Sequence, residues 1–459
     1  MSHADKKSQK PKRESGGQKP TRRSAEAARG KEREAPLFAL RSVQAESVAL
    51  KQEAGETGSG GEENVILLQD PEGFAPAHIV LSSGAYALAT LFDGERTATE
   101  VSKAFAERYG QKVPPDKIQQ LSGELDQALF LESPRFEAQV KQELQRYLET
   151  PLRPAMHSGV SYPADPDQLR QSVEGYFALP DGPGALGTAK PADVDALRGL
   201  MLPHIDLRVG GATYAHGYRA LLERSQADLF VILGVAHQGH GDGLFNVSAK
   251  DYATPLGPVK TARGMARRLQ DAAGVAPTLA EFAHKQEHSV EFQAVLMTAL
   301  LGEHAGREFE IVPVLCGSVE PFLEAKEDPQ RSDAFVRFVE ALRNELDASK
   351  RRWCIVASVD LSHVGPKFGH STIMTDRLLL PVERADRRML ATVESLDPDK
   401  FYFEIMRNEN SRHIDAVLAL LTLLAVGKGT LQRASLLHYD QMLEAPTKSA
   451  VTFASMAFE

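Results

Sequence analysis

From residue 151 onward, short apolar runs alternate with stretches of helical periodicity, and this alternation strongly limits the folds open to the chain. Four of the runs are rich in β-branched residues and bounded by polar residues or glycine, as buried strands are: LRGLML, DLFVILG, FEIVPVL and RWCIVAS. Helical stretches such as HGYRALLERSQ, TARGMARRLQDA and EFQAVLMTALL lie between them. This order predicts an α/β domain over residues 151–459, with three α/β/α layers around a mixed or mostly parallel central sheet.

A smaller domain is expected before it, over residues 63–138. HIVLSS is typical of a strand and SGAYALATLF of a short helix. Thr97 and Glu100 form a capping-box pattern that opens the helix TATEVSKAFAERYG, and PPDKIQQLSGELDQALFLES predicts a third helix. A few short helices beside a small sheet indicate a winged-helix-like α+β module. Its expected core is Phe92, Val101, Phe105, Leu125 and Phe130.

Residues 1–62 are polar and end in the stretch GETGSGGEE, which predicts a disordered basic tail and linker. Residues 1–35 hold 11 Lys and Arg against 5 Asp and Glu, although the whole chain has a net charge of −9. No aromatic residue interleaves the basic ones, and the 63–138 segment is not basic. Nucleic acid is therefore an improbable partner.

The composition is that of a globular protein without a membrane span. No apolar run reaches the roughly 18–20 residues that cross a bilayer, and the charged N-terminus lacks the apolar stretch of a secretory signal. Two cysteines, Cys316 and Cys354, argue against a disulfide framework and are expected to be small buried residues. We expect a cytoplasmic location and no membrane partner.

The chemistry is expected where the predicted strands end. His204 follows the first run, His237 follows ILGVA, and Asp360 and His363 follow the run that ends in VAS. In open α/β sheets ligands bind at the carboxyl ends of strands, so these side chains should converge. Histidine and aspartate are ordinary ligands of zinc, copper and iron. We predict a divalent metal held by His204, His237 and Asp360, with His363 as an acid or base.

A further motif, EHSVE, contains Glu287, His288 and Glu291 and opens the helix EFQAVLMTALL. His288 and Glu291 are three residues apart and share a helical face. The sequence alone supports two interpretations, lining of the site, with His288 as a second catalytic candidate, or interaction of the carboxylates with the helix dipole.

The same residues carry a family resemblance. PHIDLRVGG, ILGVAHQG, YATPLGPV, EHSVEFQ, VPVLCGS and SVDLSHVG resemble, in this order, the motifs of the Memo family, also called AmmeMemoRadiSam system protein B. That resemblance implies the fold of class III extradiol dioxygenases of the LigB type, in which two histidines and a carboxylate hold ferrous iron. It also implies a copper or iron site at His204 and His237, lined by Asp360 and His363.

Two departures from that family stand out. Where the family usually reads PHAGY, this chain has PHIDL, so Asp206 adds a carboxylate. The family also carries a ligand-like cysteine in a late motif, and the matching stretch NENSRHIDAVLALL places Asn410 at that position. An amide replaces a thiolate poorly, so either Glu409 or Asp360 completes the site or the site is degenerate, and iron or zinc is favoured over copper. His413 is interpreted as a helix-start residue.

The N-terminal module resembles the PqqD-like domains through LFDGERTATEV and LDQALFLES, which implies peptide binding along a strand edge. The Memo resemblance implies a radical SAM protein and an AMMECR-type protein as partners in a modification system. Three functions follow: a metal-dependent redox or dioxygenase-like enzyme, a non-catalytic binding or scaffold protein that recruits a peptide or radical SAM partner, and a metal-assisted hydrolase.

Overall fold

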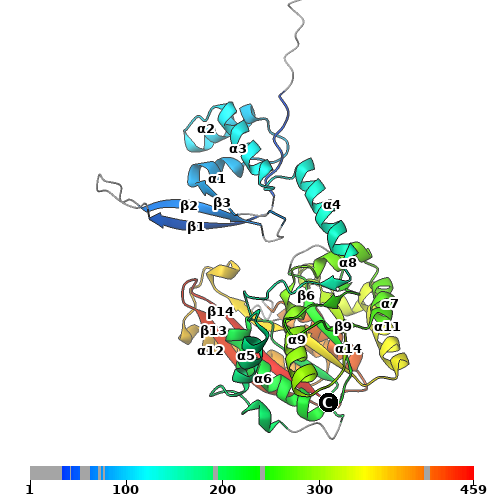
Figure 1. The fold of residues 1–459 in the computed structure, drawn as a ribbon. Helices are drawn as coiled ribbons and strands as arrows, with labels where there is room; N and C mark the ends of the chain where they lie inside the picture. The colour runs from blue at the N-terminus through cyan, green and yellow to red at the C-terminus, as the bar shows by residue number, and fades with distance from the viewer. Residues whose placement is uncertain are drawn as a thin grey trace, which may run out of the picture. The chain divides into compact units, whose positions relative to one another are not determined.

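The computed structural model divides the chain into two compact units, Met1–Glu137 and Ala138–Glu459 (Figure 1). The residues that the structure describes are 34–41, 43–51, 62–70, 74–75, 78–189, 195–237, 243–407 and 414–459. None of the helices among these residues is long and apolar enough to cross a membrane.

The first unit contains an antiparallel sheet in the order β1-β2-β3, built from Gln44–Lys51, Glu62–Gln69 and Ile79–Ser82. Strand β1 falls inside the predicted tail and linker, so the prediction of disorder through residue 62 is wrong for this part. Leu37 and Arg41 are also buried, and Arg41 pairs with Asp70. The sequence did not predict β1 because its residues, QAESVALK, pair with a strand that lies beyond a Gly-rich stretch. Local composition does not show which segments pair with each other.

Three helices complete this unit, α1 Ser83–Ala89, α2 Ala98–Tyr109 and α3 Pro115–Gln127, and α4 Pro134–Glu149 follows them. The capping box at Thr97 and Glu100 is present in full, and Gly110 ends α2 in the left-handed conformation with φ 71°. All five predicted core residues are buried, and they pack in one cluster with Leu68 and Leu81 of the sheet. Helical periodicity identified Val101, Phe105 and Leu125, whereas Phe92 and Phe130 lie just beyond α1 and α3.

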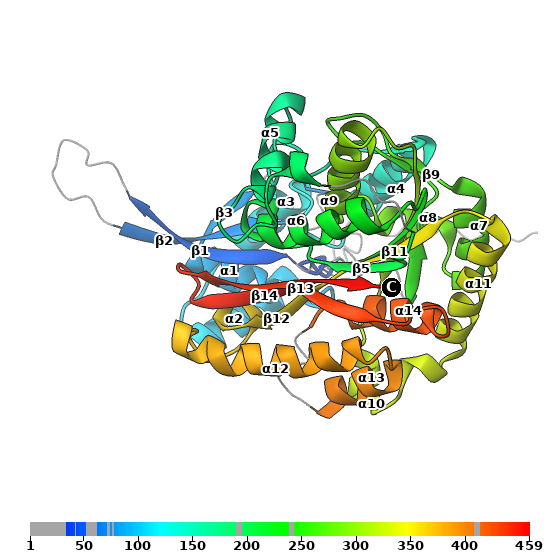
Figure 2. The ribbon, with the colours of Figure 1, turned by 90° about the horizontal axis from the view of Figure 1, so that it is seen from below.

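The second unit is built on a nine-stranded sheet. Its central strands, in the order β5-β11-β6-β10, are parallel and correspond to the four predicted runs. Two of them, β5 and β11, are labelled in Figure 2. Strands β7 and β14 add antiparallel edges, and β14 pairs also with β12 and β13. The bounds are β5 Gly199–Leu202, β6 Leu229–Val235, β7 Phe245–Val247, β9 Lys260–Thr261, β10 Glu310–Cys316, β11 Trp353–Ser358, β12 Asp360–Val364, β13 Ala434–Glu444 and β14 Ser449–Phe458. A separate parallel pair is formed by β4 Leu152–Arg153 and β8 Asp251–Tyr252.

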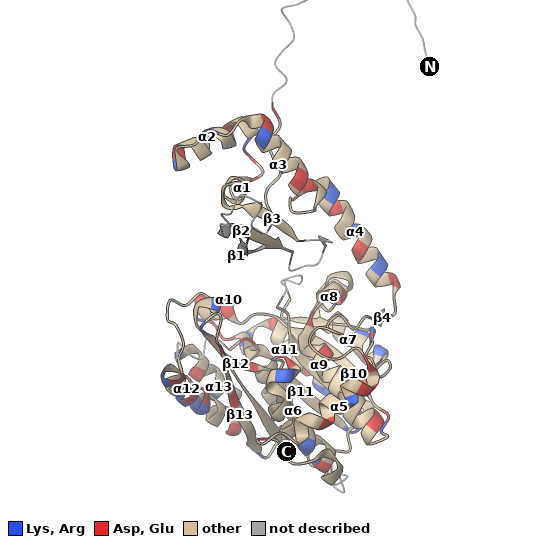
Figure 3. Cartoon of the chain, turned by 60° about the vertical axis from the view of Figure 1, so that its left-hand side comes forward, with Lys and Arg blue, Asp and Glu red and all other residues tan. Residues whose placement is uncertain are grey.

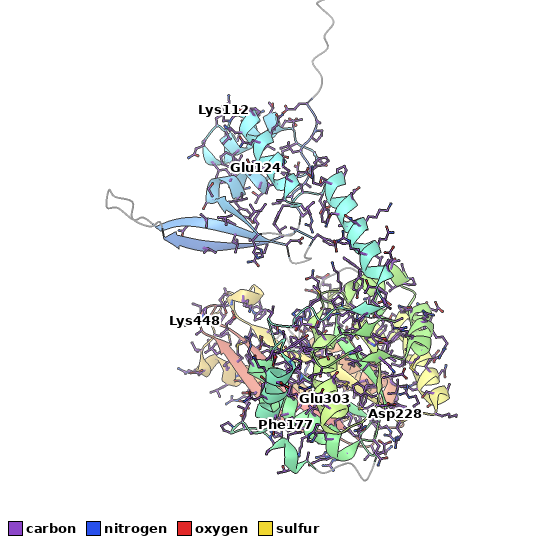
Figure 4. The ribbon with its side chains drawn as sticks, in the orientation of Figure 1. Lys112, Glu124, Phe177, Asp228, Glu303 and Lys448 are labelled. Atoms are coloured by element: carbon purple, nitrogen blue, oxygen red, sulfur yellow. The ribbon has the colours of Figure 1, made fainter. Side chains whose placement is uncertain are left out.

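Both faces of this sheet are covered, as the predicted three-layer arrangement requires. In β6, Phe230 and Ile232 pack in one apolar cluster, whereas Leu229, Val231 and Leu233 pack in the other. The first cluster includes side chains of α5 Pro166–Phe177, α6 Leu207–Arg224 and α9 His288–Met297. Phe177 of α5, labelled in Figure 4, is 1% exposed. The second includes side chains of α7 Arg263–Ala273, α11 Asp333–Ser349, α12 Asp376–Glu394, α13 Pro398–Arg407 and α14 Val417–Gly427.

The remaining helical elements lie in the connections. They are α8 Pro277–Ala283, α10 Glu320–Ala325, the π-helical turn Thr298–His304 that extends α9, and the 3₁₀ turns Leu186–Thr188, Pro329–Arg331 and Pro366–Phe368. Because β5, β6 and β11 are parallel neighbours, their carboxyl ends share one edge of the sheet, and the loops that follow β5 and β6 there carry His204 and His237.

Candidate metal centre

The two histidines that follow β5 and β6 lie side by side at this edge. His204 comes two residues after β5 and His237 two residues after β6. Their ring centroids are 5.2 Å apart, so the expected convergence of these strand ends is present in the structure. Asp360 and His363 reach the same region, but from strand β12, which pairs with β14, and not from a loop after β11. Burial continues without interruption from β11 through Val359 into β12, whose residues are buried except for the half-buried His363.

Asp415 is the residue on which the centre converges, and the sequence reasoning missed it. One carboxylate oxygen, Oδ2, lies 2.9 Å from Nε2 of His204 and 3.3 Å from Nε2 of His237. Nε2 of His363 is 4.0 Å from the same oxygen. Asp415 follows Ile414, which forms a β-bridge with Ser362, and precedes the apolar helix α14. The available signal was a single acidic residue immediately before the run AVLALLTLLAVG.

Each of these histidines is held by its other ring nitrogen. Nδ1 of His204 lies 3.0 Å from the Ser358 carbonyl, and Nδ1 of His363 lies 3.1 Å from the Leu361 carbonyl. Nδ1 of His237 is 3.1 Å from both carboxylate oxygens of Glu287. In the tautomer that donates from Nδ1, each Nε2 carries a lone pair directed at the Asp415 side of the site. Metal-binding histidines are oriented in this way by a carbonyl or a carboxylate.

Asp360 is placed differently from its predicted role as a metal ligand. Its Oδ1 accepts hydrogen bonds from the backbone amides of His204 at 2.9 Å and Ile205 at 3.2 Å. Its Oδ2 is 3.7 Å from Nε2 of His204. One oxygen therefore fixes the turn that presents His204, and only the other faces the ring.

The EHSVE motif performs both of the roles left open by its sequence. Glu287 caps α9 by accepting from the Ser289 amide and also binds His237. The His288 ring stacks on the His237 ring at 5.0 Å and 10°. Potential ligand atoms of His204, His237 and His288 all lie within 4.8 Å of one another. His288 therefore lines the centre.

Glu291 belongs to a separate buried network. It forms an ion pair with the fully buried Arg153 and accepts hydrogen bonds from the Tyr162 hydroxyl and the His157 amide. Arg153 also donates to the carbonyls of His284 and Glu287. This network anchors the segment around residue 153 against the start of α9 and so supports the loop that carries Glu287 and His288.

The acidic groups give the centre a negative potential. Burial alone would lower the pKa of His204, but Asp360 and Asp415 outweigh it and raise that pKa to about 9. Burial is likewise outweighed at His237, whose pKa is raised by Glu287 and Asp415. His288 differs: burial lowers its pKa to about 3, and the neighbouring His204 and His237 contribute to the decrease. The carboxylates around His204 and His237 therefore stabilise positive charge at these two imidazoles.

The two departures noted in the sequence have different outcomes. Asp206 caps α6 and forms an ion pair with Arg208, so its carboxylate is already paired. Asn410, together with Glu409 and His413, lies outside the described residues.

A cavity of about 600 Å³ adjoins the centre. His237 and Asp415 form part of its lining, with Val235, Val319, Leu323 and Ile414 as apolar walls and Glu320 and Glu324 from α10 as acidic ones. The volume lies within the range of roughly 300–1,000 Å³ that small-molecule sites occupy.

Comparisons with known proteins agree with this architecture. The family model described as Memo-like protein matches residues 153–457. A MEMO1 family protein of Aquifex aeolicus is 28% identical over 395 residues, which cover 85% of this chain and 95% of the relative. Others from Methanopyrus kandleri (29% identity; 61% of this chain and 89% of the relative) and Thermus thermophilus (26%; 78% and 97%) are similar. The match to the Aquifex protein is longer than the whole unit Ala138–Glu459 and so extends into the N-terminal unit. The family model covers well over half of the chain, and the chain therefore belongs to the Memo family.

Proposed function

We propose that this protein binds a divalent metal ion through Nε2 of His204, Nε2 of His237 and the carboxylate of Asp415. The observation that carries the proposal is that both imidazoles are held at Nδ1 and present Nε2 to one carboxylate oxygen. Ligand atoms around an ion with bonds of roughly 2.0–2.1 Å lie about 3.0–3.4 Å apart. The distances of 2.9 and 3.3 Å found here are close to that spacing. The residues fit a metal.

The donor set favours iron(II) or zinc. Two imidazoles and one carboxylate are the set used by non-haem iron enzymes, and zinc accepts the same donors. The thiolate that would favour copper is absent from the described cluster of potential ligands. Asp415 is the proposed anionic donor, a role for which the sequence had suggested Glu409 or Asp360.

We propose further that the centre is that of a metal-dependent enzyme, redox or dioxygenase-like in type. The metal would act as a Lewis acid toward a bound oxygen atom. His363 is the proposed acid or base, because its Nε2 faces Asp415 while its Nδ1 is held by a carbonyl. Asp360 would position His204, and Glu287 would position His237. The adjoining cavity gives a substrate access to the centre.

Metal analysis tests this proposal. Protein purified without added metal should contain about one equivalent of iron or zinc. Protein reconstituted separately with iron(II) under anaerobic conditions, with zinc or with copper should retain about one equivalent of iron or of zinc, and less copper. His204→Ala and His237→Ala should each lose it. His438→Ala is the matched control, since His438 lies on β13, stacked on His216. A wild-type protein that retains none of the three metals would leave the family assignment intact and favour the non-catalytic binding protein.

One observation in the N-terminal unit supports that second function. Strand β1 pairs with β2 alone among the described strands, and we propose that an extended peptide adds to its other edge. A peptide, or a radical SAM or AMMECR-type partner, bound along this edge is compatible with either function of the second unit. Introducing proline at alternate positions of β1 should abolish capture of such a peptide and leave metal content unchanged.

A further inference from the structure

The cavity beside the metal centre has an unusual distribution of charge. We infer that it takes a substrate with a cationic amine or guanidinium group on a short apolar chain. The inference rests on the proposed function, because it assigns a substrate class to that same centre. It depends on three features of the cavity wall: its apolar middle, its acidic helix and the absence of cationic side chains from its described lining.

The apolar part of the wall comes from three segments. Val235 ends β6, and Ile414 immediately precedes Asp415. Val319 comes directly before α10, and Leu323 lies within it. A chain of a few methylene groups in contact with these side chains gains about 0.8 kcal/mol per buried methylene. Such a contact would hold a ligand beside His237 and Asp415 without specifying its charge.

The charge is specified by Glu320 and Glu324. They are four residues apart on α10, so their side chains project from the same face of the helix, and both are exposed residues of the cavity lining (Figure 3 shows α10 with acidic positions in red). Neither carboxylate forms a hydrogen bond or an ion pair with any residue that the structure describes. Other glutamates of this unit are paired, for example Glu303 with Arg170 and Glu345 with Arg268.

Asp415 adds a third acidic group at the inner end of the cavity. Its Oδ1 is buried and has no hydrogen-bond partner among the described residues. No lysine or arginine is among the described residues of the lining. In the metal-free protein an anionic ligand would meet the carboxylates of Asp415 and of α10, whereas a cationic ligand would find two carboxylates on α10 that have no partner among the described residues. The arrangement therefore selects for positive charge.

Ligand binding by three matched probes tests this inference. At pH 7, n-pentylammonium, pentan-1-ol and pentanoate have similar apolar chains and differ in charge. Isothermal titration calorimetry, or saturation-transfer NMR for weak complexes, would be performed on the full chain in chelator and again with zinc. We expect n-pentylammonium to bind more tightly than the other two. In the double variant Glu320→Gln/Glu324→Gln its affinity should fall about threefold to tenfold, as the loss of two partly exposed ion pairs implies.

Two controls separate charge at the cavity from other effects. Pentan-1-ol should bind the double variant as it binds the wild type, because the apolar walls are unchanged. The double variant Glu340→Gln/Asp347→Asn removes the same two charges from exposed positions on α11, outside the described lining of the cavity, and should leave n-pentylammonium binding unchanged. The inference is overturned if, in chelator, pentanoate binds at least as tightly as the amine, or if the Glu320→Gln/Glu324→Gln variant retains full affinity for the amine.

The same titrations distinguish this inference from the proposed function. If zinc and iron fail to bind but the preference for the amine persists in chelator, the metal proposal fails and the cavity assignment stands. If metal binds stoichiometrically but the protein does not prefer the amine over its neutral and anionic analogues, the metal proposal stands and the cavity assignment fails.

Discussion

Two aspartates in the second unit, the partly buried Asp415 and the fully buried Asp386, have opposite surroundings. Asp415 faces the imidazoles of His204 and His237 through Oδ2, and its Oδ1 has no partner among the described residues. Asp386 on α12 is surrounded by hydroxyl groups. It accepts from Ser362 and Thr452 at 2.6 Å and from Tyr439 at 2.8 Å.

The pKa shifts of these two carboxyl groups reflect the difference. Burial would raise the pKa of Asp415, but His204 and His237 overcome it and lower the pKa. At Asp386 burial prevails over the three hydroxyl donors and the pKa is raised. A carboxylate whose hydrogen-bonding capacity is filled by hydroxyls serves packing. A carboxylate that meets several imidazoles and keeps one oxygen unpartnered has the properties of a ligand.

The largest expected effect is on metal binding by Asp415→Asn. The amide keeps the size of the side chain but removes the anionic donor, so zinc affinity should fall by more than the roughly 10–100-fold that a supporting residue costs. Competition with a chromophoric chelator would measure it. Asp386→Asn is the matched control and should leave the affinity within about threefold of wild type. Equal losses in both variants would contradict the distinction between the two aspartates.

The free energy of unfolding should depend more on Asp386 than on Asp415. Asp386→Ala leaves the buried hydroxyls of Ser362 and Thr452 and the half-buried hydroxyl of Tyr439 without their acceptor. Each unsatisfied buried group costs about 1–3 kcal/mol, so we expect a loss of at least about 2 kcal/mol in the free energy of unfolding. The single tryptophan, Trp353 on β11, reports unfolding of this unit in urea. Asp386→Asn should cost less, because the hydroxyl hydrogens can reorient. A stable Asp386→Ala variant that has lost its metal would show that Asp386 belongs to the centre.

His284 is a buried histidine beside a hydroxyl group, and it makes the free energy of unfolding depend on pH. His284 lies between the Tyr252 hydroxyl at 2.6 Å and the Asn246 carbonyl at 2.9 Å, and burial lowers its pKa to about 4. As pH falls from 7 to about 4, the unfolded chain takes up a proton at this position and the folded protein does not. The folded state therefore loses stability across that window, by about 3 kcal/mol for a shift of this size.

His284→Gln should reduce that loss, although it lowers stability at every pH. Urea unfolding at pH 7.5 and pH 4.5 in chelator measures the difference. His304→Gln removes an exposed histidine at the end of the π-helical turn and serves as the control. If the wild type and His284→Gln lose the same free energy between the two pH values, the proposed effect of burial on His284 is wrong.

The sequence was sufficient for the elements whose signals are local. The four apolar runs form the four central parallel strands, and the capping box at Thr97 begins α2 as predicted. His204 and His237 were found because parallel neighbouring strands end at one edge of a sheet, which follows from the topology that strand–helix alternation predicts. Strand β1 was missed because its pairing with β2 is not a local property.

Asp415 shows what only the tertiary structure decided. It lies 211 residues after His204 and 178 after His237, in a motif where the resemblance had directed attention to Asn410. Residue types and periodicity determined that the chain has an α/β sheet with imidazoles at its carboxyl edge. The Ile414–Ser362 bridge beside β12 and the packing of α14 against the sheet determined which carboxylate joins them. Local preferences act over a few residues, whereas a centre of this kind depends on distances of a few tenths of an ångström between segments that only folding brings together.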